Sequence, residues 1–156
     1  MLINKTIAAC SAASVVLLGS ALVWAPTVSA ATTASTTPAA TNLESDYSSF
    51  AGSRTNSVSL VNGLRTGSTI TLTSSTAPTA SFSPATGKLG YGDINIALAL
   101  SQTALAKQGI TNPTPAQLST ALGGVLDQRA GGMGWGQIAN SMGVTLGSVV
   151  SASKAA

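Results

Sequence analysis

The sequence MGWGQIANSMGVTLGSVVSA, residues 133–152, decides how the C-terminal part of the chain folds. Its small and aliphatic residues recur as they do in a helix-turn-helix pair, with Gly143 in the turn and Thr145 as the cap of the second helix. We therefore predict two short helices here, packed against each other. The positions that carry this pattern are Ile138, Ala139, Met142 and Val144, followed by Val149 and Ala152, which we expect to be buried.

The second helix of this pair lacks the side chains with which such helices read DNA. Base edges need hydrogen-bond donors and phosphates need cations. Residues 146–151 are Leu, Gly, Ser and Val, and a cation follows only at Lys154. The formal net charge is +3, and the basic residues form no run along the chain. We therefore expect the two helices to pack within the domain and not to bind nucleic acid. The alternative is a DNA-binding helix-turn-helix protein.

Two helices upstream of this pair are indicated by their caps and their apolar residues. Ser53 is an N-cap for a helix over 54–65, and Gly67 is the residue that ends it. Asp93 is the expected N-cap of a helix over 94–108. Because this second helix is apolar on nearly every face, we expect it to be central and buried.

A further helix begins after Thr114. Thr114 and Gln117 have the spacing of a capping box, and a proline occupies the first helical position between them. Gly123 and Gly124 then favour an interruption, because glycine costs about 1 kcal/mol relative to alanine inside a helix. We predict a separate short helix over 125–130.

Between the first two helices, the sequence favours a β-hairpin. Residues 68–73, STITLT, alternate polar and apolar side chains, and residues 80–83, ASFS, alternate again. Pro84 limits the second strand to an edge. The predicted fold is mainly α (α+β): a small helical domain with one short β-hairpin and the C-terminal helix-turn-helix-like pair.

The N-terminal part of the chain predicts export. Residues 1–30 have the charged start, apolar middle and small-residue end of a secretory signal peptide, so we expect cleavage after Ala30. An uncleaved membrane anchor and a lipoprotein at Cys10 are the alternatives. Residues 31–46 begin as an Ala/Thr/Ser/Pro tract and predict a disordered tether. Residues 47–156 predict one small globular domain. We expect it in the periplasm or outside the cell. The chain is expected to contact a membrane only through the signal peptide, before cleavage.

The composition excludes several catalytic sites. Among 156 residues there is no His, and the one Cys lies in the predicted signal. Ser-His-Asp and Cys-His catalysis and zinc sites are therefore excluded from the mature chain. Four carboxylates remain, at Glu44, Asp46, Asp93 and Asp127. We expect Glu44 and Asp46 to be exposed. We expect that the protein is not an enzyme and has no cofactor or metal site. The alternative is a carboxylate-based hydrolase that uses Asp93 and Asp127.

Two glycine-rich motifs carry a resemblance to other proteins. TGKLGYG at 86–92 and GMGWGQIA at 132–139, with Ala97-Leu98-Ala99 between them, resemble a group of small exported proteobacterial proteins without a known activity. The resemblance extends over about residues 50–151. It implies an exported protein and assigns no functional residue.

Trp135 is the tryptophan on which a structural and a functional interpretation differ. Large aromatic side chains are usually buried, so we expect Trp135 to anchor the last helices in the core. The functional alternative is an exposed binding surface formed with Met133 and Tyr91. The expected function is that of a non-catalytic protein whose partner is another protein or the cell-envelope surface.

Overall fold

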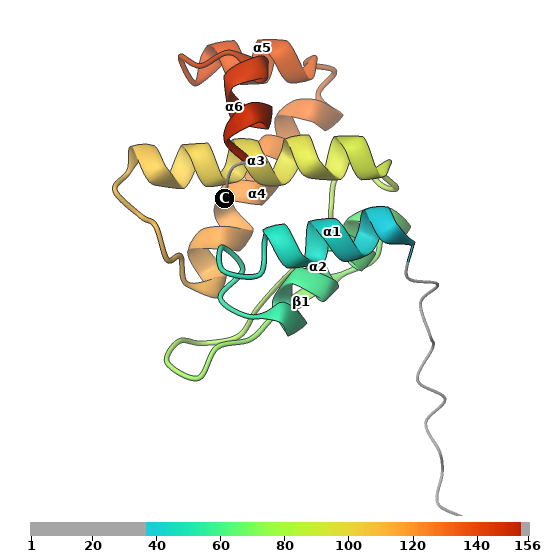
Figure 1. The fold of residues 1–156 in the computed structure, drawn as a ribbon, viewed down its shortest axis with the longest axis vertical. Coiled ribbons are helices and arrows are strands. Elements are labelled where there is room, and N and C mark those ends of the chain that lie inside the picture. Colours follow the sequence, from blue (N-terminus) through green and yellow to red (C-terminus); the bar gives the residue numbers. More distant parts are fainter. Residues whose placement is uncertain (1–36, 154–156) are drawn as a thin grey trace, which may run out of the picture. The chain divides into compact units, whose positions relative to one another are not determined.

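A computed structural model describes residues 37–153, which form a mainly helical α+β domain, as the sequence predicts (Figure 1). The elements within this range are α1 (Pro38–Asp46), α2 (Arg54–Thr66), β1 (Ile70–Leu72), β2 (Ala80–Phe82), α3 (Tyr91–Lys107), α4 (Pro115–Ala130), α5 (Trp135–Ser141) and α6 (Leu146–Ser153). The predicted signal peptide at 1–30 and residues 31–36 of the predicted tether lie outside the described residues.

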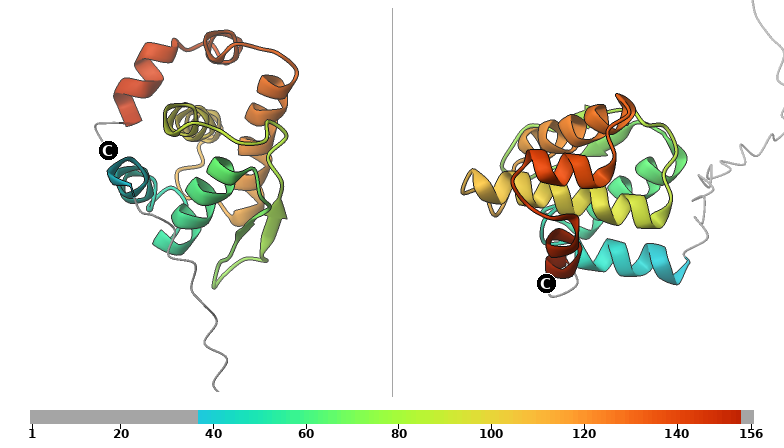
Figure 2. Two further views of the ribbon diagram at one scale, coloured as in Figure 1. Left: turned by 90° about the vertical axis from the view of Figure 1, so that its right-hand side faces the viewer. Right: turned by 90° about the horizontal axis from the view of Figure 1, so that it is seen from above.

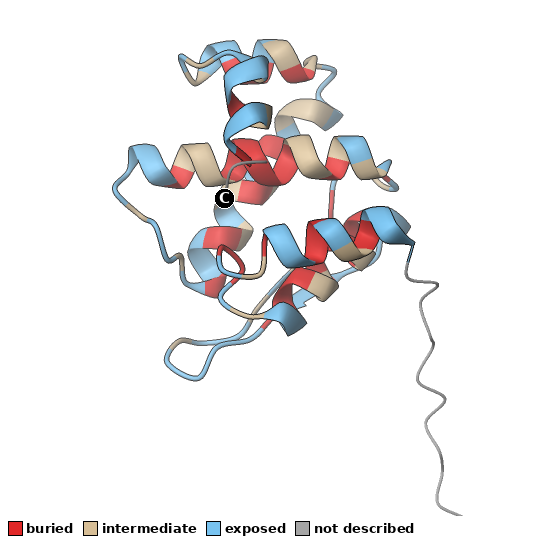
Figure 3. Cartoon of the chain, in the orientation of Figure 1, coloured by how far each residue is buried: buried red, intermediate tan, exposed pale blue. Residues whose placement is uncertain are grey.

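Helix α3 is the centre of the domain, as its apolar sequence predicts. The left view of Figure 2 looks along α3 and shows the other helices around it. Buried residues gather along its middle (Figure 3). They are Ile94, Ala97, Leu98, Ala99, Leu100, Ser101 and Leu105. The predicted start was wrong, because Gly90 is the N-cap and Asp93 lies inside the first turn.

Helix α1 corrects the prediction of a disordered tether over 31–46 in its second part, because residues 38–46 are helical. The Thr37 side chain accepts a hydrogen bond from the Ala40 amide, and Pro38 occupies the first turn. Leu43 is buried, and the Tyr47 hydroxyl that follows α1 donates to the backbone and side chain of α3. The polar tract thus contains its own helix start, and a few apolar residues attach the helix to the domain.

Helix α2 and the hairpin follow the sequence closely. The Ser53 hydroxyl accepts a hydrogen bond from the Asn56 amide at 3.1 Å, and Gly67 ends the helix with a φ of 71°. Strand β1 pairs antiparallel with β2, with Ile70 opposite Phe82. Two pairs of hydroxyl side chains bridge the exposed face of the hairpin, Thr69 with Ser83 and Thr71 with Ser81.

Gly63 allows the hairpin to approach α2. A Cβ atom at this position would lie 2.1 Å from Cγ1 of Ile70 and 3.3 Å from the carbonyl oxygen of Ser68. An alanine there requires the Ile70 side chain or its strand to move. The low helix propensity of glycine at this position is therefore offset by close packing between α2 and β1.

Helix α4 confirms the predicted capping box and corrects the predicted break. The Thr114 hydroxyl accepts from the Gln117 amide, and the Gln117 side chain accepts from the Thr114 amide. The helix then continues through Gly123 and Gly124 to Ala130. Its neighbouring side chains Leu122, Val125 and Leu126 are buried, and this packing outweighs the low helix propensity of the glycines.

Helices α5 and α6 form the predicted helix-turn-helix pair. Gly143 has a φ of 69°, and the Thr145 hydroxyl accepts a hydrogen bond from the Ser148 amide at 3.3 Å. The side chains of Ile138, Ala139 and Val149 are buried, as expected.

The expected burial of Ala152 is wrong. Ala152 is exposed, and Ser153 is the buried residue at the end of α6. Residues four apart lie on the same face of a helix. Val149 and Ser153 therefore define the inner face of α6, and Ala152 lies beside it.

Candidate functional site

Trp135 is held in a cluster of polar contacts at the start of α5. Its side chain is buried, with 9% of the residue exposed. The indole Nε1 donates to Oδ1 of Asp93 at 2.7 Å, and the guanidinium carbon of Arg129 lies 5.1 Å from the ring centroid. Because a buried indole N–H requires an acceptor, Asp93 has a structural role. The structure thus agrees with the interpretation of Trp135 as a core anchor.

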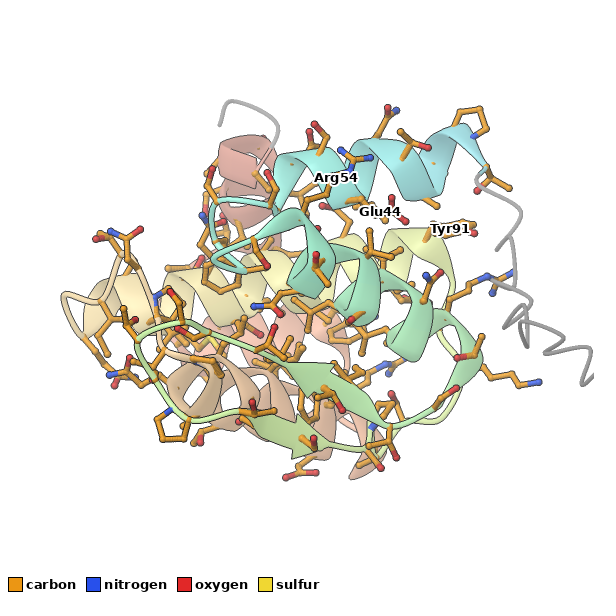
Figure 4. The ribbon with its side chains drawn as sticks, turned by 90° about the horizontal axis from the view of Figure 1, so that it is seen from below. Glu44, Arg54 and Tyr91 are labelled. Carbon is orange, nitrogen blue, oxygen red and sulfur yellow. The ribbon has the colours of Figure 1, made fainter. Side chains whose placement is uncertain are left out.

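The other two residues of the predicted binding surface lie in different surroundings. Met133 is half-buried, and its carbonyl oxygen accepts a hydrogen bond from Nη1 of Arg129 at 3.2 Å. The guanidinium carbon of Arg65 lies 5.1 Å from the ring centroid of Tyr91, which is labelled in Figure 4. Tyr91 also lines a hollow of about 270 Å³ between α1 and the start of α3. Trp135 contributes little exposed surface to a shared platform with them.

The positive charges of the described residues are largely engaged within the fold. The Arg54 guanidinium lies 3.7 Å from the Glu44 carboxylate. The guanidinium groups of Arg65 and Arg129 stack on aromatic rings. The Lys107 ammonium donates to the carbonyl oxygen of Met142. On α6 the exposed residues are Gly147, Ser148, Ser151 and Ala152. Helix α6 therefore presents no cation to a phosphate backbone within its described residues.

The carboxylates differ in burial. Glu44 is buried, with 5% of the residue exposed, which corrects the expectation that it is exposed. Its partner Arg54 comes from the start of α2, and both are labelled in Figure 4. The Ser57 hydroxyl also donates to the Glu44 carbonyl oxygen, because α1 packs on α2 there. Asp46 and Asp127 are exposed.

Tyr47 is the titratable group that the fold perturbs most clearly. Burial raises the pKa of Tyr47 to about 12, the negative charge of Asp46 adds to the rise, and a hydrogen bond with Ser153 opposes it. The phenol is therefore a neutral donor at physiological pH. It donates to Oδ1 of Asn95 at 2.7 Å, which connects the end of α1 to α3.

A pocket of about 420 Å³ lies where the start of α2, the end of β1 and the loop before α4 meet. We call it the hydroxyl pocket, and none of the residues that line it is ionisable. Its polar side chains are Ser53, Thr55, Asn56, Thr73, Ser74 and Ser75. Pro113 and Pro115 contribute an apolar part. The arrangement offers neutral hydrogen-bonding groups beside an apolar surface.

Asn56 joins two walls of the hydroxyl pocket. Its Nδ2 donates to the carbonyl oxygens of Ala51 and Thr73, each at 2.8 Å. Its Oδ1 accepts from the Thr73 amide at 2.9 Å. Asn56 is buried and its amide is fully used, so its role is to fix the walls. A ligand would instead contact the exposed hydroxyls, chiefly those of Thr55 and Ser75.

Sequence reasoning identified Ser53 as a helix cap but missed the hydroxyl pocket. Its lining residues come from three separate segments, and serine, threonine and proline in those segments are the ordinary residues of caps and turns. The sequence carries no signal for the role of Asn56 either, because its burial in the first turn of α2 is evident only from the structure.

Comparison with protein-family models, with curated proteins and with solved structures gives no match for the chain. Within residues 37–153, no helix has both the length and the apolar character to cross a bilayer. Over the same residues, no three acidic, His or Cys side chains gather as they would around a metal ion. The candidate site is therefore defined by its geometry.

Proposed function

We propose that the chain is an exported, non-catalytic protein of the cell envelope or the secreted fraction, and that it acts by binding through the hydroxyl pocket. The observation that carries this proposal is the composition of that pocket: neutral hydroxyls beside two prolines, on walls fixed by Asn56. Such a surface suits recognition by hydrogen bonds. Of the four carboxylates, two have structural partners, since Asp93 binds Trp135 and Glu44 pairs with Arg54, and none lines the pocket.

The export part of the proposal rests on the pattern of residues 1–30. The intact mass of the exported chain tests it. A mass that matches residues 31–156 would support cleavage after Ala30. A mass that retains Met1, or a lipid on Cys10, would reject it.

The binding part is tested by sedimentation of the exported chain with the native envelope fraction. Thr55→Ala/Ser75→Ala removes two exposed hydroxyls of the pocket for which the described structure gives no hydrogen-bond partner. Thr120→Ala/Ser151→Ala is the matched control, since both residues are exposed on other helices. We expect the pocket variant to lose retention and the control to keep it. Equal retention of both variants would count against the pocket.

DNA binding is the alternative function, favoured by the helix-turn-helix geometry of α5 and α6. A neutral α6 would give at most weak binding that falls steeply with salt. Sequence-selective DNA binding that persists at physiological salt would favour this alternative over the proposal.

A further inference from the structure

We propose that the ligand of the hydroxyl pocket is a short neutral saccharide. This inference rests on the proposed function, because it takes the hydroxyl pocket as the contact site and names the chemistry that the pocket would recognise. Charge, hydrogen bonding, shape and rigidity of the pocket support it in turn.

The absence of charge from the lining disfavours an ionic ligand. An ion that enters a site without an opposite charge loses its water and gains little in return. Arg54 stands between Ser53 and Thr55 in the sequence, but its guanidinium lies 3.7 Å from the Glu44 carboxylate. Arg54 is thus paired with a residue of α1, and no ionisable residue lines the pocket.

The hydroxyls disfavour a purely apolar ligand. The Ser53 hydroxyl already accepts from the Asn56 amide, so it retains a proton to donate. Thr55 and Ser75 are exposed at the pocket. An apolar ligand would bury these groups without partners, which costs more than leaving them in water. A ligand with many hydroxyls of its own satisfies them.

Pro113 favours a ligand that also has an apolar face. It is half-buried at the side of the pocket that the loop before α4 provides, whereas Pro115, the first residue of α4, is buried and offers little surface. A sugar ring presents hydroxyls at its edge and C–H groups on its faces, so it matches both parts of the lining. The volume of about 420 Å³ is in the range of pockets for small ligands and suits a short saccharide.

The pocket is organised before any ligand binds. The hydrogen bonds from Asn56 to Ala51 and Thr73 hold the start of α2 against the end of β1. Gly52, with a φ of 77°, makes the turn that places Ser53 at the rim. Fixed walls reduce the ordering that a ligand must impose, which helps a weakly binding neutral ligand most.

The test is an NMR titration of the exported chain with defined probes. Maltotriose and tri-N-acetylchitotriose are the neutral trisaccharides, trigalacturonate is the charged counterpart, and a neutral Ala/Thr/Ser/Pro peptide represents a protein ligand. We expect at least one neutral trisaccharide to give saturable amide shifts confined to residues 52–56, residues 73–75 and Thr114, because Pro113 and Pro115 have no amide hydrogen. The inference is overturned if neither does so, or if trigalacturonate or the peptide binds this region more tightly.

The two pairs of variants sharpen the titration. Loss of two hydrogen bonds in Thr55→Ala/Ser75→Ala should weaken trisaccharide binding about tenfold or more. Thr120→Ala/Ser151→Ala should bind as the unchanged chain does. Equal affinities of the two double variants would overturn the inference, because the pocket hydroxyls would then not contact the ligand.

The failure of this inference is distinct from the failure of the proposed function. Retention by the envelope fraction that depends on Thr55 and Ser75, without any trisaccharide response, would refute the saccharide and leave the pocket as a binding site. Retention that ignores both hydroxyls would refute the pocket itself, whatever the trisaccharides do.

Discussion

Replacement of Trp135 by alanine is expected to destabilise the domain strongly. The side chain is buried, with 9% of the residue exposed, and it begins α5. Truncation of a buried tryptophan costs about 3–5 kcal/mol, out of a total stability of about 5–15 kcal/mol for a typical domain. For a domain of this size, that loss lowers the Tm by roughly 10–25 °C.

The indole hydrogen bond accounts for a measurable part of this cost. Trp135→Phe keeps an aromatic ring and removes the N–H that Asp93 accepts at 2.7 Å. A hydrogen bond to a charged group contributes about 1.5–3 kcal/mol. A double-mutant cycle with Asp93→Ala should therefore give a coupling free energy of about that size between the two side chains.

Urea unfolding followed by circular dichroism measures the free energies, and tryptophan emission reports the environment of the ring. With the predicted signal removed, Trp135 is the remaining tryptophan, because Trp24 lies within residues 1–30. We expect blue-shifted emission that is poorly quenched. Red-shifted, readily quenched emission together with an unchanged Tm in Trp135→Ala would refute the burial of this side chain.

Three further variants test the packing and the titration that the structure describes. Gly63→Ala should destabilise the domain in urea unfolding by up to about 2 kcal/mol. Overpacking against Ile70, 2.1 Å from the new Cβ, costs about 1–3 kcal/mol, and the gain in helix propensity returns roughly 1 kcal/mol. An increase in stability would contradict this close approach. Gly124→Ala should instead stabilise the domain by up to about 1 kcal/mol, because nothing lies within 4 Å of its Cβ; a loss of stability would show that the glycine is required. The pKa of Tyr47 is raised from 10.0 to about 12, so folding favours the protonated phenol. The contribution of this group to the free energy of unfolding should therefore be complete below pH 10. It should fall by up to about 3 kcal/mol as the pH rises to 12. Unfolding measured from pH 9 to pH 12 should show this fall in the unchanged chain and a smaller one in Tyr47→Phe; equal slopes would argue against the raised pKa.

Local signals in the sequence were enough for most elements of the domain. Ser53 and Thr114 cap their helices as predicted, and Gly143 makes the turn between α5 and α6. These features depend on hydrogen bonds within a few residues, so the sequence contains all the groups involved.

The errors occurred where distant packing outweighs local preference. Helix α1 lies in a tract of small polar residues, yet Leu43 and Tyr47 attach it to the core. Gly123 and Gly124 do not break α4, because side chains on either side of them are buried. Both cases need contacts between segments that sequence periodicity does not describe.

The candidate site was the least predictable part. Trp135 was correctly expected in the core, whereas its acceptor Asp93 was taken for a helix cap. The hydroxyl pocket joins Thr55, Ser75 and Pro113, which the fold brings together from separate segments. Residues of these types are common in caps and turns, so only the three-dimensional structure distinguishes them as a site.

The most direct test of the central claim is amide hydrogen exchange of residues 31–156, with and without the native envelope fraction. We predict new protection at residues 52–56, residues 73–75 and Thr114, whose amides surround the hydroxyl pocket, and unchanged exchange in α5 and α6. Protection confined to α5 and α6, or no protection at all, would contradict the claim that the chain acts by binding through this pocket.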